Sequence, residues 1–266
     1  MANRLCWARR RCTAQVPAIL AGGLLLCVWR CRSPAFGAVA KAAAWPGRLP
    51  ASAPWEDRAE GLVGIDEVGR GCIAGPVLAT AVVISPEVGE QLSHGVVDSK
   101  KLSPKSRQRV YERLMALAEG PSPLLRYATT RIDRARIDEV NILEATLEAM
   151  AEAARRLRGG GAAMRELLVD GNAVPRQLAE YNCRAVVKGD AKHLCIAAAS
   201  IIAKCQRDAI MVAMDEEYPG YDFARHKGYC TKVHLDALRK LGPCAVHRRS
   251  FEPIKGYYAK GRGADA

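Results

Sequence analysis

Residues 62–84 read LVGIDEVGRGCIAGPVLATAVVI, and this stretch carries the first evidence on the fold of the chain. Two short runs rich in Val and Ile, residues 62–68 and 77–84, flank a glycine-rich turn. Apolar runs of this length that are bounded by turn residues are typical of β-strands. We therefore predict two neighbouring strands joined by the turn at residues 69–76.

Strand and helix patterns alternate through the rest of the chain. Compact apolar runs predict further strands at residues 124–132, 166–170 and 183–190. Apolar residues at helical spacing predict helices at residues 104–118, 141–158 and 193–214. The second helix begins with Asn141 and Glu144 in the pattern of a capping box, and a run of glycines follows it. This order predicts a mixed α/β fold in which helices flank one sheet.

The positive charge of the chain is concentrated at its start. The 266 residues include 40 Lys and Arg against 28 Asp and Glu, but eight of the basic residues precede Glu56, the first acidic one. The remainder has a net charge of only +4, so the whole chain does not behave as a non-specific polycation. The ten cysteines contain no CxxC pair, which disfavours a disulfide scaffold and a structural zinc site.

The acid-free start has the composition of a targeting segment. Arginines precede an apolar run at residues 16–29, and basic, alanine-rich sequence follows it. This run is shorter than the about 20 residues of a membrane-spanning helix, so it suits a signal peptide and predicts no membrane span in the mature protein. We therefore divide the chain into a leader, residues 1–55, and a body, residues 56–266. A signal peptide followed by a transit peptide favours targeting to a plastid. The alternatives are a mitochondrial presequence and an extension without a targeting function.

Four acidic side chains come near the ends of predicted strands. Asp66 and Glu67 adjoin near the end of the first strand, and Asp170 and Asp190 each end a later one. One sheet could gather them at an edge, and a site made of oxygen ligands alone suits Mg²⁺ or Mn²⁺. Clustered carboxylates can hold two such ions and activate water for phosphodiester cleavage. Acids at strand ends also serve as caps and surface charges, so spacing alone leaves both interpretations open.

Eight segments, in order, resemble the signatures of bacterial-type ribonuclease HII. They are GIDEVGRGCIAGP (64–76), DSKKLS (98–103), DEVNIL (138–143), LVDGN (168–172), VVKGD (186–190), AAASIIAK (197–204), HKGY (226–229) and HRRSF (247–251). The resemblance covers about Leu62 to Lys255. It implies a ribonuclease H-like fold with a mixed five-stranded sheet flanked by helices. It also implies a small C-terminal helical part at about residues 215–266.

The resemblance implies a metal-dependent endonuclease with a two-ion site for Mg²⁺ or Mn²⁺. Such an enzyme hydrolyses the RNA strand of RNA/DNA hybrids and cuts on the 5′ side of single ribonucleotides in duplex DNA. It leaves 3′-hydroxyl and 5′-phosphate ends, which suits ribonucleotide excision repair and DNA replication. Carried over by position, the catalytic and metal-binding acids are Asp66, Glu67, Asp170 and Asp190, the same four that the strand ends indicate.

The resemblance also implies how substrate is contacted. The loop Gly69, Arg70 and Gly71 would read the 2′-hydroxyl, because glycines let the backbone approach a sugar closely. Tyr229 would pack on the sugar of the adjacent deoxynucleotide. On their own, the loop is a tight turn with a solvated arginine and the tyrosine a core or rim residue. The residues expected along the phosphate track are Ser99, Lys100, Lys101, Lys188, His226, Lys227, Arg248 and Arg249.

Two other functions are compatible with the same fold. A non-catalytic nucleic-acid-binding protein predicts an interrupted set of acids, and a DNA-cutting nuclease is distinguished by the loop at residues 69–71 and by HKGY. We expect a monomer without direct recruitment by a sliding clamp, since the tail GYYAKGRGADA lacks the spaced Gln and aromatic pair of a clamp-binding motif. Asp208, in the polar half of the last predicted helix, is expected to be a salt-bridge partner and not a catalytic acid.

Overall fold

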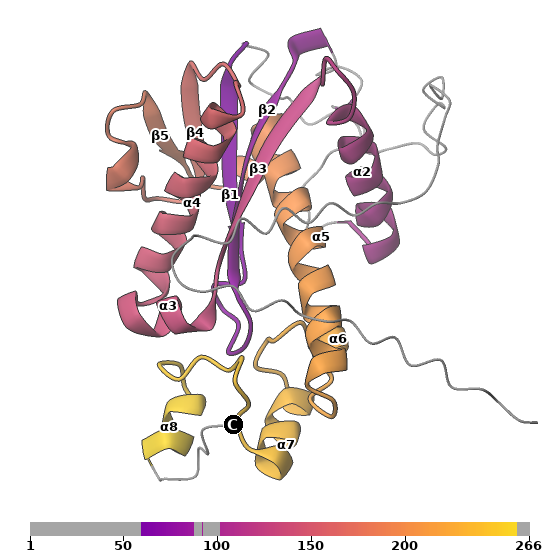
Figure 1. Cartoon of the computed structure of the whole chain (residues 1–266), viewed down its shortest axis with the longest axis vertical. Helices are drawn as coiled ribbons and strands as arrows, with labels where there is room; N and C mark the ends of the chain where they lie inside the picture. The colour runs from indigo at the N-terminus through magenta and orange to yellow at the C-terminus, as the bar shows by residue number, and fades with distance from the viewer. Residues whose placement is uncertain (1–59, 88–91, 93–101, 260–266) are drawn as a thin grey trace, which may run out of the picture. The chain divides into compact units, whose positions relative to one another are not determined.

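The computed structural model describes residues 60–87, 92 and 102–259, which lie within one compact unit, Trp45–Ala266. The predicted leader, residues 1–55, and three predicted substrate contacts, Ser99, Lys100 and Lys101, lie outside the described residues. The described part contains a five-stranded sheet in the order β3-β2-β1-β4-β5 (Figure 1). Its strands are β1 (Leu62–Val68), β2 (Val77–Ile84), β3 (Leu125–Ile132), β4 (Glu166–Asp170) and β5 (Cys183–Val186).

The sheet is mixed, as the resemblance implied. β1 runs antiparallel to β2, and β2 runs antiparallel to β3. β4 lies parallel to β1 on its other side, and β5 lies parallel to β4. Parallel neighbours need a crossover connection, and the helical segment between β3 and β4 supplies it for β1 and β4. The sequence prediction of one sheet within a mixed α/β fold is confirmed.

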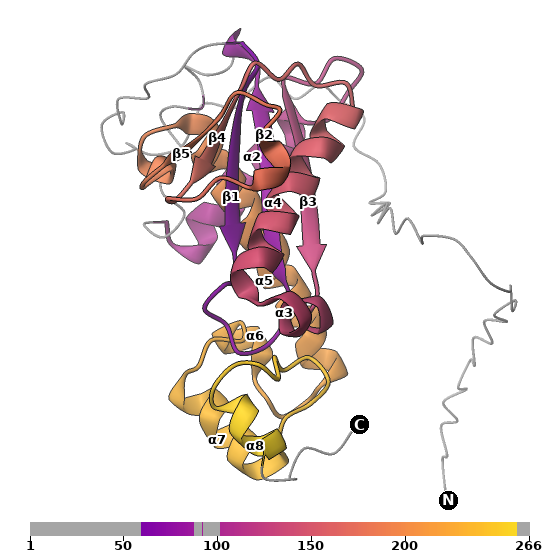
Figure 2. The ribbon, with the colours of Figure 1, turned by 90° about the vertical axis from the view of Figure 1, so that its left-hand side faces the viewer.

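Helices cover both faces of the sheet. They are α2 (Pro104–Leu117), α3 (Arg134–Val140), α4 (Ile142–Gly159), α5 (Leu194–Glu217), α6 (Phe223–His226), α7 (Lys232–Leu241) and α8 (Ile254–Ala259), with 3-10 turns η1 (Arg176–Leu178) and η2 (Gly189–Ala191). α4 packs on one face, and α5 with α2 packs on the other. Figure 2 shows α6, α7 and α8 beyond the end of the sheet, beside the β1–β2 turn. No helix in the described residues is long and apolar enough to cross a membrane.

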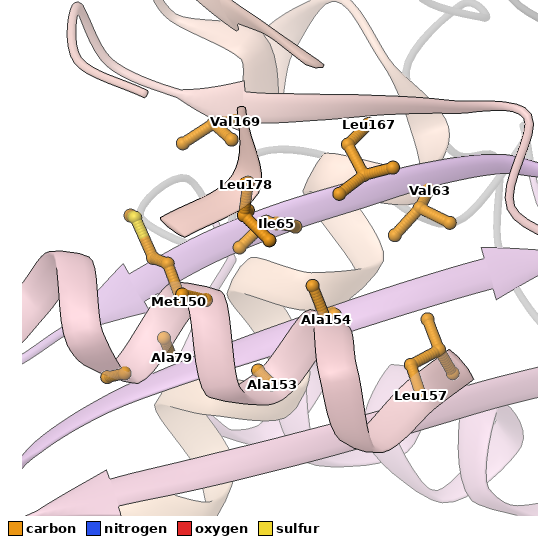
Figure 3. Close-up of a cluster of buried hydrophobic side chains, with 13 residues drawn as sticks. Val63, Ile65, Ala79, Met150, Ala153, Ala154, Leu157, Leu167, Val169 and Leu178 are labelled. Carbon is orange, nitrogen blue, oxygen red and sulfur yellow. The ribbon is translucent and has the colours of Figure 1, made fainter. Parts of the chain in front are cut away.

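The core under α4 is built from small and branched side chains. Ala154 and Leu157 of α4 belong to one buried cluster with Val63, Ile65 and Leu167 of the sheet (Figure 3). The helix begins at its predicted cap, where the Asn141 side-chain oxygen accepts hydrogen bonds from the next helical N–H groups. The glycine run ends it, as predicted.

The opposite face explains why α5 is rich in alanine. Gly64 of β1 lies so close to this helix that a Cβ there would come within 2.3 Å of the backbone at Cys195 and Ile196. Small side chains on both partners allow this approach. The prediction of a long helix pressed closely on the sheet is confirmed, and the start of α5 lies directly beside Gly64 in the middle of β1.

Two local features differ from the sequence prediction. Helix α3 was not predicted, because its seven residues carry too little periodicity to stand out from a loop. Strand β5 ends at Val186 and not at Asp190. Lys188 adopts a left-handed conformation, which breaks the strand, and Asp190 therefore lies in the turn η2.

Candidate active site

Strand register brings Asp66 and Asp170 to neighbouring positions. β1 and β4 are parallel and Ile65 pairs with Val169, so the two aspartates come next in register. Side chains alternate between the faces of a sheet. Ile65 and Val169 belong to the core under α4, which directs Asp66 and Asp170 to the face that α5 covers. The hydrogen bond of Asp66 to Ser200 of α5 agrees with this placement.

The three acids at this point repel one another. Burial raises the pKa of Asp66 well above its usual range, and the charges of Glu67 and Asp170 raise it further. Burial also raises the pKa of Glu67, which the guanidinium of Arg70 opposes and the charge of Asp170 reinforces. The Nη1 atom of Arg70 lies 3.5 Å from Oε1 of Glu67. The site therefore concentrates negative charge that its protein partners do not fully neutralise.

Asp190 reaches the same region through the turn η2. The N–H of Gly189 donates a 2.7 Å hydrogen bond to Oδ1 of Asp170. This bond fixes the turn at Gly189, directly before Asp190, against the end of β4. A Cβ at position 189 would come within 2.5 Å of the Cδ1 atom of Ile196, so a larger residue would require that side chain to shift. Asp190 itself is buried, and η2 packs against β4 and α5. The sequence predicted a strand that ends at Asp190, whereas the structure places Asp190 in a turn, next to the Gly189 that bonds Asp170.

The chemistry of these four side chains fits a divalent metal ion. They offer carboxylate oxygens alone, which hard cations such as Mg²⁺ and Mn²⁺ prefer. The raised pKa values of Asp66 and Glu67 reflect burial and crowding that a cation would relieve. Within the described ranges, no three His, Cys, Asp or Glu side chains are grouped as a ready-made ion site.

The loop after β1 presents two glycines for two different reasons. Gly69 has a φ of +99°, and a Cβ there would lie 2.3 Å from Nε of Arg207, so internal packing requires glycine. Gly71 is exposed, and a Cβ there would meet nothing within 4 Å. The space outside Gly71 is open to a ligand, which suits the close backbone approach expected of a sugar-reading loop.

Two buried arginines hold this loop from beneath. The guanidinium of Arg248 donates to the carbonyls of Gly69, Arg70 and Gly75 at 2.7, 3.0 and 3.0 Å. Arg207 of α5 donates to the carbonyls of Pro76, Ala74 and Lys227 at 3.0, 3.2 and 2.9 Å. Both side chains are fully buried. The sequence placed Arg248 on an exposed phosphate track, whereas the structure places it under the loop, fully buried, with three of its N–H groups bonded to backbone carbonyls.

His226 was also expected on the phosphate track, and it too is buried. Its ring accepts from the N–H of Gly228 through Nδ1 and lies 2.7 Å from the carbonyl of Tyr221 through Nε2, which makes Nε2 the protonated nitrogen. The ring stacks on that of His234 at a centroid distance of 4.2 Å. His226 is therefore part of an internal network and not a surface contact.

The network continues through two further histidines. Nδ1 of His234 donates to the carbonyl of Tyr229, and Nδ1 of His247 accepts from the N–H of Cys244. These bonds leave Nε2 of His247 as the donor to Nε2 of His234 at 3.0 Å. Burial lowers the pKa of His234 to about 4 and that of His247 to about 3, so both rings are neutral at pH 7. This network fixes the backbone of Tyr229.

Tyr229 stands at the rim of the site, and 42% of the residue is exposed. Its backbone forms an isolated bridge to Cys72, the residue that follows the loop at 69–71. Its hydroxyl group hydrogen-bonds the buried Cys72 thiol, and the ammonium of Lys204 lies 6.0 Å from the ring centroid. A ring that is held at one edge and open on another can pack against a substrate.

The remaining expected contacts differ in their exposure. Lys188 is exposed on the turn after β5. Lys227 is half-buried, and its Nζ donates to the carbonyl of Ala224 at 2.6 Å. The guanidinium of Arg249 lies 4.6 Å from the centroid of the Tyr258 ring. These three remain predicted phosphate contacts.

Asp208 takes the structural role expected of it. Its carboxylate lies 2.7 Å from Nζ of Lys204 and 3.8 Å from Nη1 of Arg107 of α2. It therefore ties α5 to α2 instead of joining the acids at the strand ends.

Sequence reasoning missed Arg207, His234 and His247. Arg207 carried a signal, because it falls on the buried stripe of α5 between Ala203 and Met211, where a cation needs internal partners. The two histidines carried none, since their partners come from separate segments of the C-terminal part.

Comparisons with known proteins agree with this geometry. The Ribonuclease HII family model matches residues 63–254. The Ribonuclease HII of Chlamydia muridarum is 47% identical over 194 residues, which are 73% of this chain and 83% of the relative. That of Francisella philomiragia is 44% identical and covers 73% of this chain and 97% of the relative.

Solved structures show the same fold. The ribonuclease H2 of Pyrococcus horikoshii OT3 superposes with a TM-score of 0.61 at 26% identity, covering 76% of this chain and 99% of the other. Bst-RNase HIII in complex with Mn²⁺ superposes with a TM-score of 0.59 at 18% identity, covering 76% of this chain and 70% of the other. At this identity the likeness shows only that the two proteins share a fold. With the family model matched over most of the body and relatives above 40% identity, this chain belongs to the ribonuclease HII family of endonucleases.

Proposed function

We propose that the chain hydrolyses the RNA strand of RNA/DNA hybrids and cuts on the 5′ side of single ribonucleotides in duplex DNA, leaving 3′-hydroxyl and 5′-phosphate ends. The observation that carries the proposal is the register of β1 and β4, which sets Asp66 and Asp170 side by side directly before the loop at residues 69–71. A phosphate held by the acids would then have its ribose beside that loop. Such cleavage would act in ribonucleotide excision repair and in DNA replication.

Asp66, Glu67, Asp170 and Asp190 would hold two divalent ions, Mg²⁺ or Mn²⁺. Ions bound there would supply Lewis-acid stabilisation of the phosphodiester and lower the pKa of a water molecule. The residues of the chain then perform the remaining tasks. The carboxylates orient the ions, the loop at 69–71 binds the ribose, and Tyr229 packs on the next sugar. The all-carboxylate set of ligands supports this choice of ion.

Two alternatives on the same fold are less well supported. A non-catalytic binding protein has no need for buried acids that repel one another, because burial of like charges costs stability. A DNA-cutting nuclease has no need for a glycine loop whose outer side is open to a sugar.

We propose that the enzyme acts as a monomer. An archaeal relative, 27% identical with a TM-score of 0.55 over 76% of this chain and 91% of that one, was solved as a PCNA:RNase HII complex from Archaeoglobus fulgidus. Residues 1–55 would direct the chain to an organelle, with a plastid favoured over a mitochondrion.

One assay tests the proposal directly. Purified protein is incubated with Mg²⁺ or Mn²⁺ and three labelled duplexes: all DNA, one embedded ribonucleotide, and an RNA/DNA hybrid. We expect cleavage of the last two and none of the first, with a 3′-hydroxyl end at the cut. Cleavage of the all-DNA duplex at a comparable rate would favour the DNA-cutting alternative, and no cleavage of any duplex would favour the binding protein.

A further inference from the structure

The hydrogen bonds on the buried side of the loop at residues 69–71 determine which backbone groups its exposed side presents to a ligand. Arg248 takes the carbonyls of Gly69 and Arg70 as hydrogen-bond acceptors. In the described residues the only cis peptide bond is Glu252–Pro253, so both loop peptides are trans. In a trans peptide the C=O of one residue and the N–H of the next point in opposite directions. The N–H groups of Arg70 and Gly71 therefore point away from Arg248.

Nothing inside the described protein uses these two donors. The next amide, that of Cys72, turns back to the carbonyl of Gly69 at 3.4 Å, but the amides of Arg70 and Gly71 have no such backbone partner in the described residues. Both residues are exposed, and the space above Gly71 is open. Two adjacent outward N–H groups with an open approach can donate to an oxygen atom on a ligand.

We propose that Arg248 is a positioning residue for substrate recognition: it holds the Gly69 and Arg70 carbonyls inward so that the Arg70 and Gly71 N–H groups face the ribose as a pair of donors. The inference rests on the proposed function, which places the ribose at this loop. Arg248 touches no substrate and acts only through the backbone.

The charge of Arg248 adds to its geometric effect. A peptide whose carbonyl accepts a hydrogen bond is polarised, and its N–H becomes a better donor. Burial lowers the pKa of Arg248 to about 10, with neighbouring Arg207 contributing, so the guanidinium remains protonated at pH 7. A lysine at this position would keep the charge, but one nitrogen cannot reproduce the planar fork that reaches separate carbonyls.

The first test uses Arg248→Lys. We expect kcat/KM at a single embedded ribonucleotide to fall about 100-fold, as expected when a site built to bind one hydroxyl loses its donors. Cleavage of an RNA/DNA hybrid, which offers many 2′-hydroxyls, should fall about 10-fold or less. Affinity for an all-DNA duplex should be unchanged. The matched control is Arg239→Gln, an exposed arginine on α7 paired with Asp236, which should alter neither rate.

The second test does not depend on how the variant folds. Amide hydrogen exchange of the otherwise unaltered chain is compared in the presence of the three duplexes without divalent metal. The Arg70 and Gly71 amides should exchange rapidly in the free protein. They should be protected by the duplex with one ribonucleotide and not by the all-DNA duplex.

The outcomes separate the two claims. If the unaltered protein does not prefer ribonucleotide-containing duplexes, the proposed function fails. If it does, but a folded Arg248→Lys keeps the same ratio of rates on the two substrates, the positioning role is wrong. Equal protection of the two amides by all three duplexes also overturns it.

Discussion

The backbone N–H of Gly189 donates a 2.7 Å hydrogen bond to Oδ1 of Asp170. This bond commits one carboxylate oxygen to the turn η2 and leaves the other for a ligand. It also links two of the candidate catalytic acids, because Asp190 follows Gly189 directly. The arrangement determines which substitution of Asp170 can separate catalysis from folding.

Asp170→Asn should keep the fold and abolish cleavage. The amide oxygen of asparagine can still accept from Gly189, but a neutral group cannot supply the charge that anchors a hard cation. Loss of several kcal/mol of metal-derived stabilisation predicts a fall in kcat of at least about 100-fold. Rates and binding are measured on the single-ribonucleotide duplex.

The control for this variant is Asp208→Asn. It removes a carboxylate that pairs with Lys204 and Arg107 at the edge of the site, and such partly exposed pairs contribute at most about 1 kcal/mol. Its activity should therefore stay close to that of the unaltered protein. Near-normal cleavage by Asp170→Asn would remove Asp170 from the metal site.

Asp66→Asn should stabilise the metal-free protein while abolishing activity. Because the folded pKa of Asp66 lies above its ordinary value of 3.8, the unfolded chain loses this proton first as the pH rises, and the ionised group destabilises the folded state at neutral pH. A gain of about 1 kcal/mol would raise Tm by about 2–4 °C in a domain of this size. Thermal unfolding in a chelator measures it.

Divalent metal provides the complementary measurement. Mg²⁺ or Mn²⁺ should raise the Tm of the unaltered protein, because a ligand that binds only the folded state stabilises it. The increase should be much smaller in Asp66→Asn. A Tm below that of the unaltered protein in chelator would show that Asp66 is a structural group.

The strand-end acids were predictable because strands have a simple period. Asp66 and Asp170 both come at the ends of apolar runs, so the sequence could place them at one edge of a sheet, and the register of β1 and β4 brings them to neighbouring positions. Asp190 was assigned to a strand because an apolar run does not reveal the left-handed Lys188 that ends β5 early. Arg248 and His226 were read as surface charges, since their burial depends on carbonyls and rings contributed by distant segments. Such tertiary partners leave no local pattern.

The histidine network should make the fold sensitive to mild acid. His234 and His247 have folded pKa values of about 4 and about 3, whereas an unfolded histidine titrates near 6.5. Between these limits only the unfolded chain binds the protons, so the free energy of unfolding falls as the pH drops below about 6.5. At pH 5.5 each histidine should cost about 1.4 kcal/mol.

Urea unfolding at pH 7.5 and pH 5.5 checks this effect. His234→Gln removes one titrating group and can still place an amide near the Tyr229 carbonyl, so its stability should depend less steeply on pH. The same pH dependence in the variant and in the unaltered protein would mean that His234 does not titrate as inferred.

Removal of the leader should leave the enzyme intact. A chain that begins at Ser52 keeps all the elements of the sheet and should be soluble and as active as the full chain. Residues 1–55 fused to a fluorescent reporter should concentrate it in an organelle, with a plastid expected. Fluorescence spread evenly through the cytosol would contradict a targeting role.

Tyr229 should matter most where a single ribonucleotide must be recognised. A hybrid offers many 2′-hydroxyls, whereas an embedded ribonucleotide is defined by one hydroxyl and by the deoxy-sugar beside it. The exposed face of the Tyr229 ring can pack where an extra oxygen on that neighbour would crowd it. Tyr229→Ala should therefore lower the rate on the single-ribonucleotide duplex more than the rate within long RNA tracts.

Two further variants separate this role from general binding. Tyr229→Phe keeps the ring and loses only the hydroxyl bond to Cys72, so it should retain most of the selectivity. Lys100→Ala removes a predicted phosphate contact outside the described residues. It should weaken the binding of both substrates alike and lower the slope of log affinity against log salt concentration by about one unit. The measured quantity is the ratio of initial rates on the two substrates at fixed salt. If Tyr229→Ala lowers both rates in the same proportion as Lys100→Ala does, Tyr229 is a packed rim residue and does not read the junction.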